Sequence, residues 1–211
     1  MNLPNALTVA RIAATPLIAV LPIANSWTLR MTAFVLFALA AITDYIDGHL
    51  ARSRKQETDL GRLLDPLADK LLLLGTFIPM FILAPQFPFV TPFGNVGLPW
   101  WVVAIVIGRE AFMTVYRQAA ARRGVVISAI GPAKWKTAFQ LIWQGSAYFW
   151  FFAATLATVK GWTDDSRWHA FALFNGTVGT FMMLGAVLLT VYSLVLYLKG
   201  FSRVFATHPA K

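Results

Sequence analysis

The sequence predicts an all-α integral membrane protein with six membrane-spanning helices and both termini in the cytoplasm. Three observations support this fold class: an apolar composition, long stretches without charge, and an uneven distribution of basic residues. Hydrophobic residues make up 58% of the 211-residue chain and charged residues only 13%, against about 45–50% and about 25% in soluble domains. So few charged side chains cannot cover a soluble protein, and we expect one membrane domain over residues 1–211.

Stretches without Asp, Glu, Lys or Arg are long enough to cross a bilayer, which needs about 20 apolar residues. They cover residues 12–29, 71–108, 137–159 and 168–198, and the second has room for most of two spans. Dividing the chain at Pro, Gly and charged residues predicts six helices. Their expected ranges are 7–23, 28–51, 60–83, 98–122, 134–157 and 170–198.

The predicted helices differ in composition. The first carries Arg11 and Pro16, so a signal peptide or an interfacial helix is an alternative; the late position of Arg11 and the absence of a small-x-small cleavage site favour a span. The second and third helices are joined by the basic segment 52–55. The fifth is rich in aromatic residues suited to lipid contact. The sixth can pack closely, within the bundle or across a dimer, at Gly176, Gly179 and Gly185.

Basic residues gather on one side of the predicted helices. Fourteen Lys and Arg residues fall on the side of the termini, only three fall on the other side, and Arg109 falls within a span. This positive-inside bias places the termini in the cytoplasm and the protein in the cytoplasmic membrane. The net charge of +9 is therefore expected to meet lipid headgroups or phosphorylated substrates rather than nucleic acid.

Four aspartates stand at helical spacing at the cytoplasmic ends of the second and third helices. Asp44 and Asp47 are separated by three positions, and Asp65 and Asp69 by four, so each pair shares a helix face. Ordinary helix capping suits Asp59, but it does not account for four converging carboxylates, which repel one another unless cations are present.

Carboxylate oxygens without Cys ligands predict a hard divalent ion, Mg²⁺ or Mn²⁺. The chain contains no Cys, and its three His residues are scattered. Four carboxylates have room for two ions, an arrangement that typically holds a diphosphate during displacement at phosphorus.

The segment from Asp44 to Asp69 resembles a known signature. Its residues fit DxxDGxxAR(x)8GxxxDxxxD at all eight fixed positions and every spacing. This is the signature of the CDP-alcohol phosphatidyltransferase family. The resemblance implies a fold of six membrane helices with cytoplasmic termini, and usually a homodimer.

The resemblance also implies a role for each matching residue. Asp44, Asp47 and Asp65 would hold the metal ions, and Asp69 would be the general base while also lying near the metals. The acceptor oxygen would attack the β-phosphorus of CDP-diacylglycerol and release CMP. Residues expected to bind the CDP moiety or to lie beside it are Asn5, Thr8, Gly48, Ala51, Arg52, Thr58 and Gly61.

Motifs outside the signature resemble the phosphatidylglycerophosphate synthase branch of this family, whose acceptor is sn-glycerol 3-phosphate. They are residues 2–12, the run from Gly108 to Glu110 followed by Arg117, and residues 134–137. In that branch a Gly directly precedes the first Lys, whereas here Pro132 and Ala133 separate Gly131 from Lys134. Cations on the fourth and fifth helices suit an acceptor that carries a phosphate. We expect these to be Arg109, Arg117, Lys134 and Lys136.

Other interpretations remain open from the sequence. The acceptor could be inositol phosphate, phosphatidylglycerol or serine, and the pair Arg109–Glu110 could be structural. From other classes, the aspartates could form the ion site of a cation or proton transporter, or the protein could be a structural membrane protein. A transporter is disfavoured because the acidic cluster occurs once and lies at a membrane surface.

Overall fold

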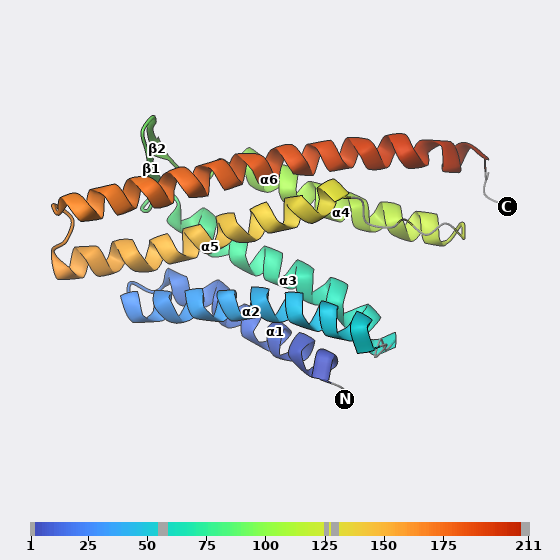
Figure 1. Ribbon diagram of the computed structural model, residues 1–211, viewed down its shortest axis with the longest axis horizontal. Helices are drawn as coiled ribbons and strands as arrows, with labels where there is room; N and C mark the ends of the chain where they lie inside the picture. Colours follow the sequence, from blue (N-terminus) through green and yellow to red (C-terminus); the bar gives the residue numbers. More distant parts are fainter. Residues whose placement is uncertain (1–2, 55–58, 125–126, 128–130, 208–211) are drawn as a thin grey trace. The chain divides into compact units, whose positions relative to one another are not determined.

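The structure is a computed structural model that describes residues 3–54, 59–124, 127 and 131–207; the side chains at 3–4, 45–60, 62–63 and 200–207 are outside this description. Within the described residues the chain forms six α-helices close to the predicted bounds (Figure 1). They are α1 (Leu3–Val20), α2 (Trp27–Arg54), α3 (Asp59–Leu83), α4 (Trp100–Ala121), α5 (Gly131–Lys160) and α6 (Ser166–Thr207). A short 3₁₀-helix, η1 (Leu21–Ile23), follows α1 directly.

Four segments in the described part of the chain are long and apolar enough to cross a membrane. They are Asn5–Ile23, Trp27–Asp44, Leu64–Leu83 and Ser166–Lys199. The helices α4 and α5 are also long, at 22 and 30 residues, but α4 carries charged residues and α5 carries Gln, Trp and Tyr side chains. Composition thus supports an α-helical membrane protein, and the six crossings stay a prediction.

The chain divides into two compact units. Unit 1 comprises Met1–Leu98 and Gln144–Thr177, and unit 2 comprises Pro99–Trp143 and Val178–Lys211. The long helices α5 and α6 are therefore each divided between the two units.

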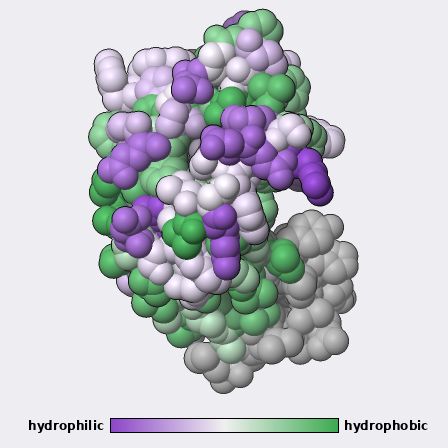
Figure 2. Space-filling view, turned by 90° about the vertical axis from the view of Figure 1, so that its left-hand side faces the viewer, coloured by the Kyte–Doolittle hydropathy of each residue, from purple (hydrophilic) through white to green (hydrophobic). Residues whose placement is uncertain are grey.

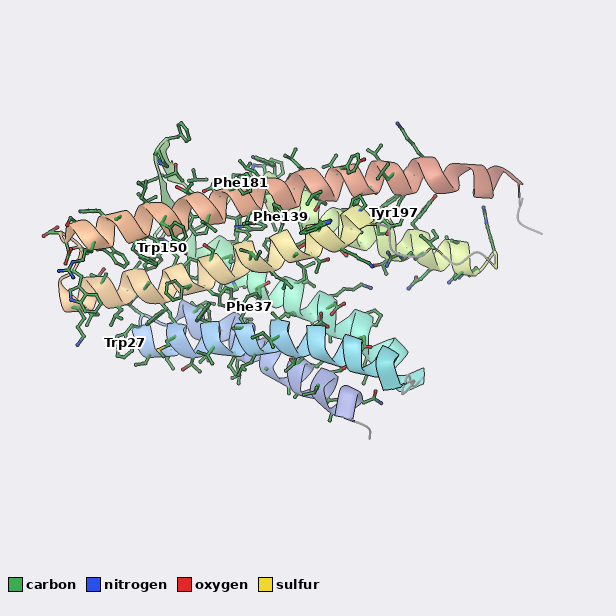
Figure 3. All side chains as sticks on the ribbon, viewed as in Figure 1. Trp27, Phe37, Phe139, Trp150, Phe181 and Tyr197 are labelled. Atoms are coloured by element: carbon green, nitrogen blue, oxygen red, sulfur yellow. The ribbon has the colours of Figure 1, made fainter. Side chains whose placement is uncertain are left out.

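In unit 1, α1 packs against both α2 and α3. The second half of α5 is tied to these helices by buried polar groups. The Tyr148 hydroxyl donates to the carbonyl of Ile18 at 3.1 Å, and Gln144 Nε2 donates to Thr76 Oγ1 at 2.9 Å. The Tyr148 ring also stacks on Phe37 of α2, labelled in Figure 3, with ring centroids 5.4 Å apart. Buried polar groups that find partners stabilise a specific packing of helices.

A short β-hairpin between α3 and α4 was not predicted, and it is a small addition to a fold that is otherwise helical, as expected. Its strands, β1 (Phe89–Thr91) and β2 (Gly94–Val96), pair antiparallel. Gly94 has φ +114, a conformation that glycine tolerates best. The backbone of Val90 approaches α6 so closely that a Cβ at Gly176 would lie 2.0 Å from the Val90 carbonyl oxygen.

The residues between α5 and α6 explain why α5 ends and α6 begins at this turn. Gly161 has φ +70 beyond the end of α5, and the Trp162 N–H donates to the Ala157 carbonyl at 2.9 Å, as in a Schellman motif. Asp165 caps α6 by accepting a bond from the Arg167 N–H at 2.8 Å. Figure 2 looks onto the end of the helices that carries this turn and shows hydrophilic residues there, with hydrophobic flanks beside them.

In unit 2, α4 joins the first half of α5 and the second half of α6. Val102 and Val106 are completely buried on α4. Phe139 and Phe181, labelled in Figure 3, have ring centroids 6.3 Å apart. A Cβ at Gly185 would lie 2.4 Å from Phe139 Cδ1, so the expected close packing at Gly185 is confirmed within this unit.

Candidate functional site

The N-terminal half of α1 draws three of the four predicted metal ligands to one end of unit 1. Thr8 Oγ1 donates to Asp65 Oδ1 at 2.8 Å, and Arg11 Nη1 donates to Asp69 Oδ1 at 3.3 Å. Arg11 Nη1 also forms an ion pair with Asp44. Thr8 and Arg11 are three positions apart and so share a face of α1. We call the four aspartates at 44, 47, 65 and 69 the acidic site.

The described carboxylates of the acidic site, those of Asp44, Asp65 and Asp69, are accessible to solvent. The Asp44 and Asp69 side chains are 42% and 62% exposed, whereas the Arg11 side chain is 1% exposed. Asp65 is also exposed. A ligand from solvent can therefore reach the carboxylates while the guanidinium stays covered by protein.

Other predicted residues of this site fall into two groups. Asn5 and Thr8 of α1 are buried, and Gly61 is buried in the first turn of α3. The remaining ones lie outside the described residues or have side chains outside them: Asp47, Gly48, Ala51, Arg52 and Thr58.

The donors of the acidic site fit a hard divalent cation by their chemistry. Among the side chains that the structure describes, no three His, Asp or Glu groups lie close enough together to hold one ion. A cation nevertheless bridges carboxylates from two helices, because the guanidinium of Arg11 contacts both Asp44 of α2 and Asp69 of α3. The residues present thus attract positive charge, and all-oxygen donors suit Mg²⁺ or Mn²⁺.

Unit 2 contains a second group of charged residues, which gathers predicted acceptor residues around Glu110. Arg109 Nη1 donates to Glu110 Oε1 at 2.7 Å, and Lys136 Nζ contacts the same oxygen. The Arg109 and Lys136 side chains are each 7% exposed. By contrast, Lys134 is exposed at the start of α5, so the structure does not bring it into this group.

The C-terminal half of α6 holds the two arginines of α4. Arg109 Nη2 donates to Ser193 Oγ at 3.3 Å, and Arg117 Nη2 donates to the Tyr197 hydroxyl at 3.4 Å. Both guanidinium groups also lie over the Tyr197 ring, at 5.9 and 5.7 Å from its centroid, which is a favourable cation–π geometry. Tyr197 is labelled in Figure 3. We call Arg109, Arg117, Lys136, Glu110, Ser193 and Tyr197 the basic cluster.

The basic cluster has an excess of positive charge. Its three cations meet one carboxylate, that of Glu110. Within the described part of the chain, Arg109 Nε and Gln140 Oε1 are buried polar atoms without a hydrogen-bond partner. Arg109 and Lys136 are buried and Arg117 is exposed, so this excess of positive charge, with the spare donor of Arg109, favours an anionic ligand.

Three residues of the acidic site's surroundings and of the basic cluster were not predicted from the sequence: Arg11, Ser193 and Tyr197. Arg11 was used only to decide whether the first helix is a span and to orient the helices, and was given no role in the site, although an arginine inside an apolar helix is a signal for a buried partner. Ser193 and Tyr197 are four positions apart on α6, but polar residues at that spacing are common in membrane helices. Their contacts with α4 become visible only in the folded chain.

These features define the class of protein: an α-helical membrane protein that carries an acidic site and a basic cluster. Comparison with known proteins then defines the family: the model of CDP-alcohol phosphatidyltransferase matches residues 1–198. The chain therefore belongs to the CDP-alcohol phosphatidyltransferase family, and the resemblance seen in the sequence is confirmed.

Several relatives carry names from this family. A protein of Arabidopsis thaliana named CDP-diacylglycerol–glycerol-3-phosphate 3-phosphatidyltransferase 1, chloroplastic/mitochondrial, is 36% identical over 67% of this chain and 48% of its own length. A Bacillus subtilis protein named CDP-diacylglycerol–glycerol-3-phosphate 3-phosphatidyltransferase is 34% identical over 67% of this chain and 73% of its own. A rice protein named cardiolipin synthase (CMP-forming) is 31% identical over 97% of this chain and 58% of its own. The chain thus spans about half the length of the Arabidopsis relative.

Proposed function

We propose that the protein transfers the phosphatidyl group of CDP-diacylglycerol to sn-glycerol 3-phosphate, which gives phosphatidylglycerophosphate and CMP. The observation that carries this proposal is the family membership of residues 1–198 together with the open carboxylates at the predicted positions. The names of the Arabidopsis and Bacillus relatives favour glycerol 3-phosphate as the acceptor.

The acidic site would hold the diphosphate end of the reaction. Asp44, Asp47, Asp65 and Asp69 would bind two Mg²⁺ or Mn²⁺ ions, which when bound offset the charge of the diphosphate and stabilise the departing CMP. The CDP moiety would contact residues in and before the signature: Asn5, Thr8, Gly48, Ala51, Arg52, Thr58 and Gly61. Thr8 supports this arrangement, because its bond to Asp65 fixes one carboxylate against α1.

Asp69 would act as the general base. Its carboxylate is 62% exposed, so an acceptor hydroxyl from solvent can reach it. The acceptor oxygen attacks the β-phosphorus of CDP-diacylglycerol, its proton passes to Asp69, and the bond between this phosphorus and the CMP oxygen breaks. We propose direct transfer, because the chain has no Cys and the signature contains no Ser or His nucleophile at its fixed positions.

The phosphate of the acceptor would bind at the basic cluster. Arg109, Arg117 and Lys136 supply the cations, and Arg109 retains an unpaired buried donor within the described residues. Lys134, which is exposed, would bind the acceptor only as it approaches. We further propose that the protein lies in the cytoplasmic membrane with its active site on the cytoplasmic side, as the positive-inside bias favours, and that it forms a homodimer, as the family resemblance implies.

The proposal is tested by the release of CMP from CDP-diacylglycerol by the protein purified in detergent. We expect release that requires Mg²⁺ or Mn²⁺ and glycerol 3-phosphate, measured with a panel of acceptors and with a chelator as control. Release with another acceptor would retain the chemistry and overturn the role of the basic cluster. No release from folded protein, with ion flux in vesicles, would favour a transporter.

Phosphatidylglycerol is the second candidate acceptor. The relative named cardiolipin synthase (CMP-forming) matches 97% of this chain, a longer stretch than the match to either of the other two relatives above. Phosphatidylglycerol has a phosphodiester and two acyl chains, whereas glycerol 3-phosphate has a phosphomonoester and dissolves in water. The acceptor panel therefore separates the two candidates directly.

A further inference from the structure

We propose that Arg11 is a resident counter-cation of the acidic site, which occupies the carboxylates of Asp44 and Asp69 until a divalent ion displaces it. The inference rests on the proposed function, since it concerns the ion that this site is proposed to bind. Arg11 stands outside the signature of eight fixed positions, on a different helix.

A single nitrogen of Arg11 connects two helices. Nη1 donates to Asp69 Oδ1 of α3 at 3.3 Å and forms an ion pair with Asp44 Oδ1 of α2. A cation therefore already lies between carboxylates that the signature assigns to metal binding. Because the Arg11 side chain is 1% exposed, its guanidinium reaches these carboxylates from within the protein, while the carboxylates themselves stay in contact with water.

The exposure of the partners makes an exchange of cations feasible. Asp44 and Asp69 are 42% and 62% exposed, so an ion from solvent can approach their outer oxygens while Arg11 holds inner ones. An entering divalent ion must compete with the guanidinium for the same two carboxylates. The affinity for the metal is then set by the difference between the two sets of interactions, and Arg11 lowers it.

A second buried arginine of unit 1 provides a matched control. Arg30 is 2% exposed, as is Arg11 as a whole residue. Its described partners are neutral: it donates to the Pro22 carbonyl at 3.0 Å, contacts the Thr155 hydroxyl and lies 4.6 Å from the centroid of the Phe87 ring. Replacing Arg30 removes a buried guanidinium without changing the charge next to an acidic-site carboxylate.

The test measures binding of Mn²⁺ alone to the full chain in detergent, by electron paramagnetic resonance and without lipid substrate. We expect Arg11→Met to bind Mn²⁺ about tenfold more tightly than the unchanged protein, which corresponds to about 1.4 kcal/mol. Arg30→Met should bind with unchanged affinity. Arg11→Lys keeps the charge but loses the fork of donors, so its affinity should fall between those of Arg11→Met and the unchanged protein.

Thermal unfolding with and without Mn²⁺ confirms that each variant is folded. Metal-free Arg11→Met should unfold at a lower temperature than the unchanged protein, because its carboxylates lose their counter-cation, and should gain more from added Mn²⁺. If Arg11→Met is not obtained folded, Arg11→Lys decides: tighter binding supports the proposal and equal binding overturns it.

Four results would overturn the proposal in distinguishable ways. Equal affinity in Arg11→Met would reduce Arg11 to a packing residue, and weaker affinity would show that it holds the carboxylates in position to bind metal. If the unchanged protein binds no Mn²⁺, or if Asp44→Asn leaves binding intact, the metal site of the proposed function fails together with the role of Arg11. The first two results leave the proposed function standing.

Discussion

The acidic site and the basic cluster hold their charges in opposite ways. At the acidic site the described carboxylates are accessible to solvent and their described counter-cation, Arg11, is buried. In the basic cluster the cations Arg109 and Lys136 are buried, as is most of Glu110, whose side chain is 24% exposed. A charge at the surface can change partners at low cost, whereas a buried charge must keep its partners or be destabilised. This difference suits the acidic site to chemistry with exchangeable ions, and the basic cluster to holding a ligand in a preset position.

The largest expected effect tests whether the acidic site performs the chemistry. Asp69→Asn keeps the size of the side chain but removes the group that accepts the proton, and Asp69 is also a predicted metal ligand. We expect the rate of CMP release to fall by about 10²–10⁴-fold, the usual contribution of a general base. The rate should be measured with purified protein at saturating Mg²⁺ and both substrates.

Asp164→Asn is the matched control for this change. Asp164 is an exposed carboxylate in the turn between α5 and α6, far along the chain from the signature, and we expect its replacement to leave the rate unchanged. An Asp69→Asn protein that retains more than about a tenth of the rate would exclude Asp69 as the base.

The next largest effect tests how tightly the basic cluster depends on its ion pairs. Lys136→Met leaves Glu110 with only Arg109 as its described cationic partner. Breaking a buried pair typically costs about 3–5 kcal/mol, and we expect the lower end because Arg109 remains. In a chain of this size that lowers the unfolding temperature in detergent by roughly 6–12 °C.

Two variants make this experiment decisive. Lys134→Met removes a charge two positions away on the same helix, but Lys134 is exposed, so its cost should stay within about 0.5 kcal/mol. Adding Glu110→Gln to Lys136→Met also breaks the remaining ion pair with the buried Arg109 and should lower the unfolding temperature further. Equal unfolding temperatures for Lys136→Met and Lys134→Met would contradict the difference between buried and exposed cations.

The helices could be predicted from the sequence, but the hairpin could not. Stretches of membrane length without charge leave few alternatives to helices, and all six predicted ranges correspond to α-helices. The strands Phe89–Thr91 and Gly94–Val96 are too short for a pattern of alternation. They depend on contacts distant in sequence: the Trp150 indole donates to the Pro88 carbonyl at 3.1 Å, and Gly176 admits the backbone of Val90.

The same limit applies to the functional residues. The spacing of Asp44, Asp65 and Asp69 identified them, because helical periodicity relates residues on one helix and the signature relates two neighbouring helices. The partner of Asp44 and Asp69 lies 33 and 58 positions earlier in the chain, a relation that no local pattern contains. Tyr197 stands 80 positions from Arg117 and was missed for the same reason.

The smallest expected effect concerns Tyr197 and refines the description of the basic cluster. Tyr197→Phe keeps the ring below Arg109 and Arg117 but removes the hydroxyl that accepts a bond from Arg117 at 3.4 Å. Loss of one such bond corresponds to about 1 kcal/mol. We expect the KM for glycerol 3-phosphate to rise about fivefold with kcat unchanged, because the hydroxyl positions a binding group and does not touch the reacting atoms.

Tyr192→Phe is the control on the same helix, since Tyr192 is 54% exposed, and both kinetic constants should remain unchanged there. Tyr197→Leu also removes the ring and should raise the KM further, because the cation–π contacts of both arginines are lost with it. If Tyr197→Phe instead lowers kcat and leaves KM unaltered, the basic cluster acts in the chemical step. The separation between a reacting acidic site and a binding basic cluster would then be wrong.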